Sequence, residues 1–235
     1  MTIRGLLFDK DGTLIDSVGT WEPVYREIMR DHLQHRADEW DAIFENAGWD
    51  AERRRFRSNS KLAAGTTHDF VETWWPELEG EAREEKILWV NQQYRDLSLK
   101  HLQPLMPLGP LLDEWRGMGF KIGIGTNDNE ASARGHMERL GVTEKFDFIC
   151  GYDSVKRAKP HGDMVHAFCE ALDLEPQQVA VVGDNLHDLD MARDAGAGLA
   201  IGVLTGNSEH HDLAPHADAV LESIAELSAF LRERT

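Results

Sequence analysis

Residues 3–14 of the 235-residue chain read Ile3-Arg4-Gly5-Leu6-Leu7-Phe8-Asp9-Lys10-Asp11-Gly12-Thr13-Leu14, and they are the most informative part of the sequence for its architecture. Its first half, residues 3–8, is short and mostly apolar, which is typical of a buried strand. Its second half is polar and contains a glycine, which indicates a turn. We therefore expect a strand that carries two acidic side chains, Asp9 and Asp11, just beyond its carboxyl end.

From residue 120 onward the chain alternates between apolar segments typical of strands and segments patterned for helices. Strands are predicted at 120–125, 146–150, 179–182, 199–203 and 219–221. Helices are predicted at 129–140, 162–172 and 186–195, and after the last strand. Such alternation predicts an α/β fold with a Rossmann-like parallel sheet sandwiched by helices. The strand at residues 3–8 matches these strands in kind, so we assign it to the same sheet.

Residues 18–101 differ in composition from the rest of the chain, because they are highly charged and patterned for helices. Helices are predicted to start at Trp21–Tyr25 and to lie around 38–46, 50–63, 66–75 and 80–98. Six of the seven tryptophans lie in this segment, which suggests the core of a small domain with one or two of them lining a pocket. We expect an all-helical domain at 18–101, inserted into a core domain of residues 1–17 and 102–235. Hinges are expected near Asp16-Ser17 and Gln103-Pro104.

The formal net charge is −17, which disfavours binding to nucleic acid and to anionic membranes. No apolar run approaches the length needed to span a membrane. Two cysteines, Cys150 and Cys169, form no disulfide framework and are expected to be reduced and buried. We expect a soluble cytoplasmic protein that acts as a monomer or a homodimer.

Polar residues gather just after the predicted strands. Ligands of open parallel sheets bind beyond the carboxyl ends of the strands, so these residues are the candidates for a site. They are Asp9 and Asp11, then Thr126, Asn127 and Asp128, then Lys159, and finally Asp184, Asn185 and Asp188. Crowded carboxylates without thiolate or imidazole suit a hard cation such as Mg²⁺. With a lysine and a hydroxyl beside it, such a site suits phosphoryl transfer.

Four of these stretches, in this order, resemble the motifs of the haloacid dehalogenase superfamily. They are residues 8–14 with the Asp-x-Asp-Gly-Thr pattern, Thr126-Asn127, Lys159-Pro160 and residues 183–188. The inserted segment lies where members with a type-1 helical cap carry that cap. The resemblance therefore covers the whole chain and implies a cap that opens for substrate and closes over it.

The resemblance also implies a role for each core residue. Asp9 would attack phosphorus and form an aspartyl-phosphate, and Asp11 would act as general acid and then as general base. Mg²⁺ would be held by Asp9, Asp184 and the backbone carbonyl of Asp11. Phosphate would be bound by Thr126, Asn127 and Lys159. Asp188 and Asn185 would orient the groups that bind the metal without being ligands themselves. An acid at position 11 favours phosphoryl chemistry over carbon–halogen cleavage.

Lys10 departs from the family pattern, in which the residue between the two aspartates is more often apolar. Strand alternation predicts that its side chain points away from the aspartate pair, where it could pair with another acid. The choice between Lys156 and Lys159 as the active-site cation is open on sequence grounds, and the Lys-Pro motif favours Lys159.

Candidate specificity residues in the insertion are Arg53, Arg57, Lys61, Thr66 and His68. The basic run 53–57 could attract an anionic substrate, although a solvated helix face is the simpler interpretation. His68 is expected to be structural or exposed.

The resulting prediction is a magnesium-dependent phosphatase of small phosphorylated metabolites, similar to the phosphoglycolate phosphatases or acting on a sugar phosphate. A phosphomutase of the β-phosphoglucomutase type is an alternative with the same core residues. A non-catalytic binding protein is a third, which the intact set of motif residues disfavours.

Overall fold

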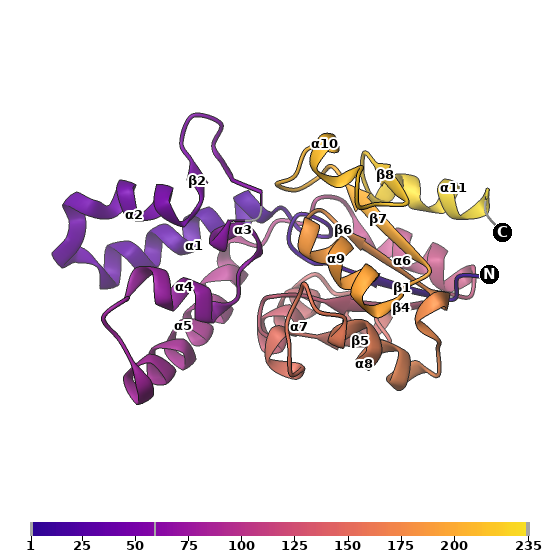
Figure 1. Ribbon diagram of the computed structural model, residues 1–235, viewed down its shortest axis with the longest axis horizontal. Helices are drawn as coiled ribbons and strands as arrows, with labels where there is room; N and C mark the ends of the chain where they lie inside the picture. Colours follow the sequence, from indigo (N-terminus) through magenta and orange to yellow (C-terminus); the bar gives the residue numbers. More distant parts are fainter. Residues whose placement is uncertain (1, 59, 234–235) are drawn as a thin grey trace.

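Six parallel strands form the central sheet in the order β5-β4-β1-β6-β7-β8 (Figure 1). The computed structural model describes residues 2–58 and 60–233. Residues 1 and 234–235 of the expected core domain, and residue 59 of the expected helix 50–63, therefore lie outside the described residues. The strands are β1 (Gly5–Phe8), β4 (Lys121–Gly125), β5 (Phe148–Cys150), β6 (Val179–Gly183), β7 (Leu199–Val203) and β8 (Ala219–Leu221). The predicted parallel α/β sheet is confirmed.

Helices cover both faces of this sheet, as its apolar strands require. Leu6 and Phe8 of β1 pack in one buried cluster and Leu7 packs in another, because neighbouring residues of a strand point to opposite faces. Full burial of one such side chain contributes about 1.5–3 kcal/mol. The first cluster includes α6 (Leu108–Gly117), α7 (Glu130–Arg139) and α11 (Leu227–Arg232), and the second includes α8 (Asp163–Leu172), α9 (Leu186–Ala195) and α10 (His210–Leu213). Short 3-10 helices are η2 (Thr143–Lys145), η3 (Tyr152–Ser154), η4 (Pro176–Gln178) and η5 (Ile224–Glu226).

Helix α6 is an element that the sequence analysis did not predict, because three prolines at 104, 107 and 110 obscured it. Pro107 precedes the helix as its N-cap and Pro110 lies in its first turn. The backbone N–H groups of a first turn have no partner within the helix, so a proline there removes no hydrogen bond.

The segment between β1 and α6 forms a second lobe, which Figure 1 shows beside the sheet. We call residues 17–101 the helical lobe and the rest the sheet lobe. The helical lobe contains α1 (Ser17–His32), η1 (Gln34–Glu39), α2 (Trp40–Ala47), α3 (Lys61–Ala64), α4 (Thr67–Trp74) and α5 (Gly80–His101). Its buried cluster is rich in aromatic rings, among them Tyr25, Phe44, Phe70 and Trp74. Aromatic rings contribute much of the apolar surface that is buried in a small core.

The helix predicted at 50–63 is wrong. Strands β2 (Trp49–Asp50) and β3 (Arg55–Phe56) form an antiparallel hairpin instead, with Trp49 opposite Phe56. The Asp50 carboxylate accepts a hydrogen bond of 3.0 Å from the backbone N–H of Arg53, which closes the turn. Arg54 has a φ of 51°, a left-handed conformation that ends any helix there.

The two chain crossings between the lobes lie side by side. The N–H of Asp16 donates to the carbonyl of Gln103 at 2.7 Å, and the N–H of Leu105 donates to the carbonyl of Leu14 at 3.2 Å. These bonds join the segments where hinges are expected. Within the described ranges 2–58 and 60–233, no helix is both long enough and apolar enough to cross a membrane.

Candidate active site

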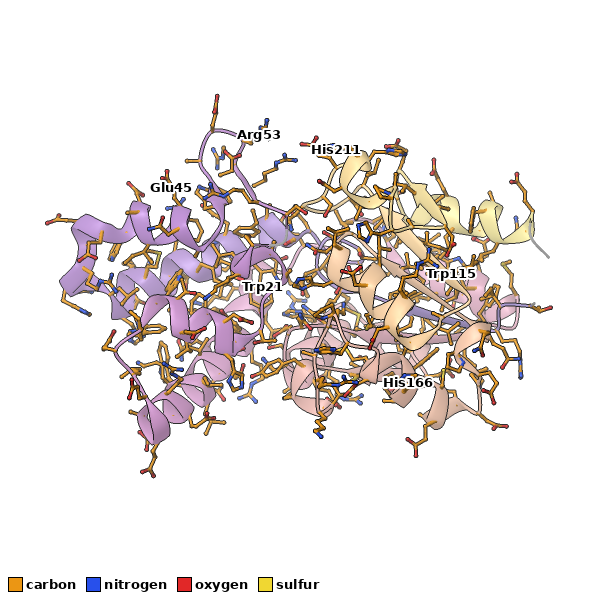
Figure 2. The ribbon with its side chains drawn as sticks, in the orientation of Figure 1. Trp21, Glu45, Arg53, Trp115, His166 and His211 are labelled. Carbon is orange, nitrogen blue, oxygen red and sulfur yellow. The ribbon has the colours of Figure 1, made fainter. Side chains whose placement is uncertain are left out.

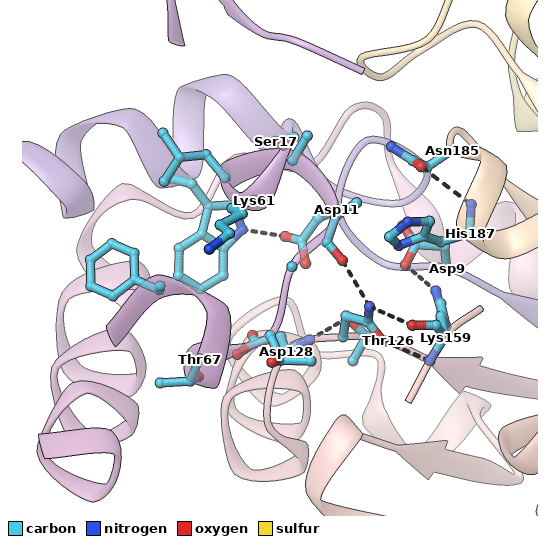
Figure 3. A pocket seen from close by; sticks show the side chains of 18 of the residues that line it. Asp9, Asp11, Ser17, Lys61, Thr67, Thr126, Asp128, Lys159, Asn185 and His187 are labelled. Atoms are coloured by element: carbon cyan, nitrogen blue, oxygen red, sulfur yellow. Dashed lines mark hydrogen bonds and ion pairs between the residues drawn. The ribbon is translucent and has the colours of Figure 1, made fainter. Parts of the chain in front are cut away.

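The carboxyl ends of the central strands meet at one edge of the sheet, under the helical lobe. Asp9 follows β1, Thr126 follows β4 and Asp184 follows β6, and β1 pairs with both β4 and β6. These residues line a cavity of about 70 Å³. Figure 3 shows Asp9, Lys159 and His187 on one side of it and Lys61 and Thr67 on the other. Both lobes therefore contribute to the site.

Three carboxylates converge in the floor of the cavity. Oxygen atoms of Asp9, Asp184 and Asp188 lie within 4.8 Å of one another, and all three side chains are buried. Burial raises the pKa of Asp9 from its ordinary value of 3.8 to about 7, with further increases from Asp188 and Asp11 that Lys159 opposes. Burial and the neighbouring Asp9 and Asp188 also raise the pKa of Asp184 well above its ordinary value. Oxygen ligands at this spacing fit a small divalent cation.

Lys159 is the cation of this cluster. Its Nζ lies 2.6 Å from Asp9 Oδ1 and 2.6 Å from Asp188 Oδ1. Burial disfavours the ammonium, but Asp188 and Asp9 outweigh burial and raise the pKa of Lys159. Lys156 is exposed and does not line the cavity, so the geometry favours Lys159 over Lys156.

Local sequence fixes the acidic residues in place. Asn185 is the N-cap of α9, and its backbone N–H donates to Asp188 Oδ2 at 3.0 Å. Asp184 Oδ2 accepts a hydrogen bond of 2.9 Å from the backbone N–H of Asn207. The predicted supporting positions of Asp188 and Asn185 are thus next to Asp184, and Asp188 also reaches the carboxylate cluster itself.

The Asp11 carboxylate contacts Trp21 and Lys10. The Trp21 indole N–H donates to Asp11 Oδ1, and Lys10 Nζ lies 2.6 Å from Asp11 Oδ2. Lys10 Nζ also lies 3.1 Å from Asp128 Oδ2. Burial disfavours the Lys10 ammonium, but Asp11 and Asp128 outweigh it and raise its pKa. Burial raises the pKa of Asp128 to about 6, an increase that Lys10 opposes.

The prediction that Lys10 points away from the aspartates is therefore wrong, whereas its pairing with another acid is confirmed. Strand β1 ends at Phe8, and the backbone N–H groups of Leu14 and Ile15 both donate to the carbonyl of Lys10. Lys10 thus belongs to a turn, where the alternation of a strand no longer applies.

Thr126 and Asn127 occupy the end of β4. Thr126 is buried and lines the cavity, and its Oγ1 accepts a hydrogen bond of 3.1 Å from the N–H of Asp128. The Asn127 side chain points to the helical lobe, where its Nδ2 donates to the carbonyl of Ala64 at 2.8 Å. Its Oδ1 accepts from the backbone N–H of Lys159 at 3.1 Å.

Residues 3–196 match the model of the haloacid dehalogenase-like hydrolases. The chain belongs to this family.

Curated relatives of this hydrolase include several phosphatases. A phosphoglycolate phosphatase from Chromobacterium violaceum is 28% identical, over 96% of this chain and 95% of that protein. An N-acetylmuramic acid 6-phosphate phosphatase from Pseudomonas aeruginosa is 27% identical, over 97% of this chain and 94% of that protein. Among solved structures, a β-phosphoglucomutase from Clostridium difficile superposes with a TM-score of 0.73 at 18% identity, covering 99% of each chain. A hydrolase from Pseudomonas syringae gives a TM-score of 0.71 at 21% identity, again with 99% of each chain covered.

The helical lobe of this hydrolase brings only part of the predicted specificity set to the cavity. Lys61 and Thr66 line it, whereas Arg53, Arg57 and His68 do not. Arg57 donates to backbone carbonyls of its own lobe, and the His68 ring packs edge-on against Tyr152 at 5.7 Å.

Sequence reasoning missed several residues that line the cavity. Among them are Ser17, Tyr25, Phe70, Tyr94 and His187. Trp21 also lines it, as expected for one tryptophan of the insertion. Trp21 and Tyr25 are four residues apart on α1 and so share one face of the helix, which was the one usable signal in the sequence.

Proposed function

We propose that this hydrolase is a phosphatase that cleaves a small phosphomonoester through an aspartyl-phosphate on Asp9. The observation that carries the proposal is the position of Asp9 in the cavity floor, 2.6 Å from Lys159, with Asp11 of the same turn also lining the cavity. Phosphatases among the relatives support this reaction class.

Each of the four residues Asp9, Asp11, Thr126 and Lys159 has a separate role in the proposed reaction. An oxygen of Asp9 forms a bond to phosphorus while the bond to the leaving oxygen breaks, and Asp11 donates a proton to that oxygen. In the second step Asp11 takes a proton from water, whose oxygen bonds to phosphorus and frees the Asp9 carboxylate with release of phosphate. Thr126 donates a hydrogen bond to the phosphoryl group, and Lys159 offsets the negative charge that develops on it.

The charge of the site supports Mg²⁺ as its cofactor. Three carboxylates face a single lysine in the floor of the cavity, so two negative charges are uncompensated when all three are ionised. Burial first, and then the neighbouring Asp9 and Asp188, raise the pKa of Asp184. Asp9, Asp184 and the backbone carbonyl of Asp11 would hold the ion, with Asp188 beside them. When bound, it would neutralise the carboxylates and the phosphoryl oxygens.

The cavity supports a small substrate with a polar or acidic leaving group. Its volume is about 70 Å³, and Lys61 is the cation that the helical lobe contributes to its lining. A carboxylate of a phosphoglycolate-like substrate would pair with Lys61, whereas a sugar phosphate would use the hydroxyls of Ser17, Thr66 and Thr67. The helical lobe would act as the cap, with the domain limits and hinges that the sequence predicts. Both cysteines are free and buried, which fits a reducing cytoplasm.

The test is hydrolysis of 4-nitrophenyl phosphate with Mg²⁺ by the wild type and by Asp9→Asn. We expect the variant to lose turnover by at least about a thousandfold, because the amide is no nucleophile. Asp113→Asn is the control, since that carboxylate is exposed on α6 and pairs with Lys145. Appreciable turnover by Asp9→Asn would refute the nucleophile. Phosphoglycolate and hexose phosphates would then be compared, and an isomerised sugar phosphate as product would favour a phosphomutase.

A further inference from the structure

The carboxylate of Asp11 is held by two side chains that come from different lobes. Lys10 reaches Oδ2 from the turn after β1, and the Trp21 indole reaches Oδ1 from α1. Figure 2 places Trp21 at the junction of the two lobes. Each oxygen of a carboxylate has two lone pairs, so an ion pair at Oδ2 and one hydrogen bond at Oδ1 leave a second site on each oxygen for a proton in transfer.

Neither donor is free to move. The Lys10 side chain is fully buried and is also paired with Asp128 at 3.1 Å. The Trp21 ring packs on Tyr94 at 5.1 Å and on Tyr25 at 5.9 Å between ring centroids. Lys10 Nζ lies 5.2 Å from the centre of the same Trp21 ring, so the two donors also contact each other.

We infer that Lys10 and Trp21 are positioning residues that aim the Asp11 carboxylate at the leaving oxygen of the substrate. This inference rests on the proposed function, in which Asp11 is the acid and then the base. We call the two residues the Asp11 clamp. Because Trp21 belongs to the helical lobe and Lys10 to the sheet lobe, the clamp is complete only when the lobes are docked as they are here. Proton transfer is thereby confined to the closed arrangement.

Loss of the clamp should lower the rate most for substrates whose leaving oxygen must be protonated. General acid catalysis contributes about 10²–10⁴-fold, and a misplacement of about 1 Å costs on the order of 10²-fold. A strongly basic leaving group requires the proton, whereas 4-nitrophenolate departs with little help. Loss of either donor should therefore slow esters of basic alcohols or phenols selectively.

The experiment compares kcat/KM for 4-nitrophenyl phosphate and 4-methylphenyl phosphate, two esters of nearly the same shape and different leaving-group basicity. We expect Trp21→Phe and Lys10→Met to lower kcat/KM for the 4-methylphenyl ester at least about tenfold more than for the 4-nitrophenyl ester. Asp11→Asn should show the same selectivity more strongly. Trp74→Phe is the matched control, because this buried tryptophan of the helical lobe has no hydrogen-bond partner for its indole nitrogen among the described residues.

Equal losses for both esters in Trp21→Phe and Lys10→Met, beside a selective loss in Asp11→Asn, would overturn the clamp and leave the proposed function intact. Turnover that survives in Asp9→Asn would instead refute the proposed function. If Lys10→Met does not fold, Trp21→Phe decides alone, since phenylalanine keeps an aromatic ring and removes the indole N–H, and the Trp74→Phe control makes the same reduction in size.

Discussion

At the scale of single residues, the position of Asp184 depends on two glycines. A Cβ on Gly12 would lie 2.7 Å from the Asp184 carboxylate, and a Cβ on Gly206 would lie 1.9 Å from its Oδ2. Gly12 also has a φ of 89°, which disfavours any other residue. The carboxylate is thus surrounded by backbone on two sides and reaches the cavity in one orientation.

Gly206→Ala should displace the Asp184 carboxylate and weaken binding of Mg²⁺. We expect kcat to fall at least about tenfold and the Mg²⁺ concentration for half-maximal activity to rise, since a ligand displaced by about 1 Å loses its geometry. Gly117→Ala on α6 is the control, because a Cβ there meets nothing within 4 Å. An unchanged Mg²⁺ requirement would contradict the proposed role of Asp184.

Strand ends explain which site residues could be predicted. Asp9, Thr126 and Asp184 follow strands that pair with one another, so a correct strand prediction brings them together. The contacts of Lys10 with Asp128 and of Trp21 with Asp11 could not be predicted in this way. Lys10 and Asp128 are distant in sequence and meet within the sheet lobe, whereas Trp21 reaches Asp11 from the helical lobe.

At the scale of elements, asparagines connect the two lobes beside the site. Asn127 joins β4 to the end of α3 through Ala64. Asn91 of α5 donates to the Tyr152 hydroxyl at 3.0 Å and accepts from Thr67 of α4 at 2.6 Å. Because the Asn127 side chain also accepts a hydrogen bond from the backbone N–H of Lys159, the docking of the helical lobe and the position of Lys159 depend on the same side chain.

Asn127→Ala should therefore lower kcat/KM by about tenfold or more, because both the lobe contact and the Lys159 backbone lose a partner. Asn46→Ala, at an exposed position of α2, should leave kcat/KM unchanged. Steady-state kinetics with 4-nitrophenyl phosphate provide the measurement. Equal kcat/KM in wild type and Asn127→Ala would show that this contact has no part in positioning Lys159.

The elements themselves were predictable where apolar periodicity was strong. All six strands of the sheet and helices α7, α8 and α9 lie close to their predicted ranges. The β2–β3 hairpin was missed because Ala51, Glu52 and Arg53 are good helix formers, while the Asp50 turn that competes with a helix is a local side-chain contact. The cross-strand contact between the rings of Trp49 and Phe56 stabilises the hairpin and outweighs the helix propensity of residues 51–53.

At the scale of the whole molecule, the acidic site opposes folding when no cation is bound. The pKa values of Asp9, Asp128 and Asp184 are all raised by burial. The native state therefore binds more protons than the unfolded state between about pH 4 and pH 7, and the free energy of unfolding decreases as the pH rises through this range. A net charge of −17 adds repulsion in the same direction.

The melting temperature in EDTA should thus decrease from pH 5 to pH 8. The increase that Mg²⁺ produces should be larger at pH 8, because the cation binds ionised carboxylates. Differential scanning fluorimetry at pH 5 and pH 8, with EDTA and with Mg²⁺, measures the melting temperature and its increase on Mg²⁺ binding. In Asp184→Asn we expect most of the Mg²⁺ effect to disappear and the melting temperature in EDTA at pH 8 to rise by roughly 2–4 °C. A melting temperature in EDTA that increases steadily with pH would refute this account.

The pairing of the two chain crossings, at Asp16 with Gln103 and at Leu14 with Leu105, has an evolutionary consequence. A segment whose ends meet can be exchanged without changing the path of the chain that surrounds it. The sheet lobe would keep its strand order and the residues that follow its strands if a different insert were attached at these two bonds. New substrate ranges can therefore arise by replacing one module, provided that the new insert again supplies a donor to Asp11.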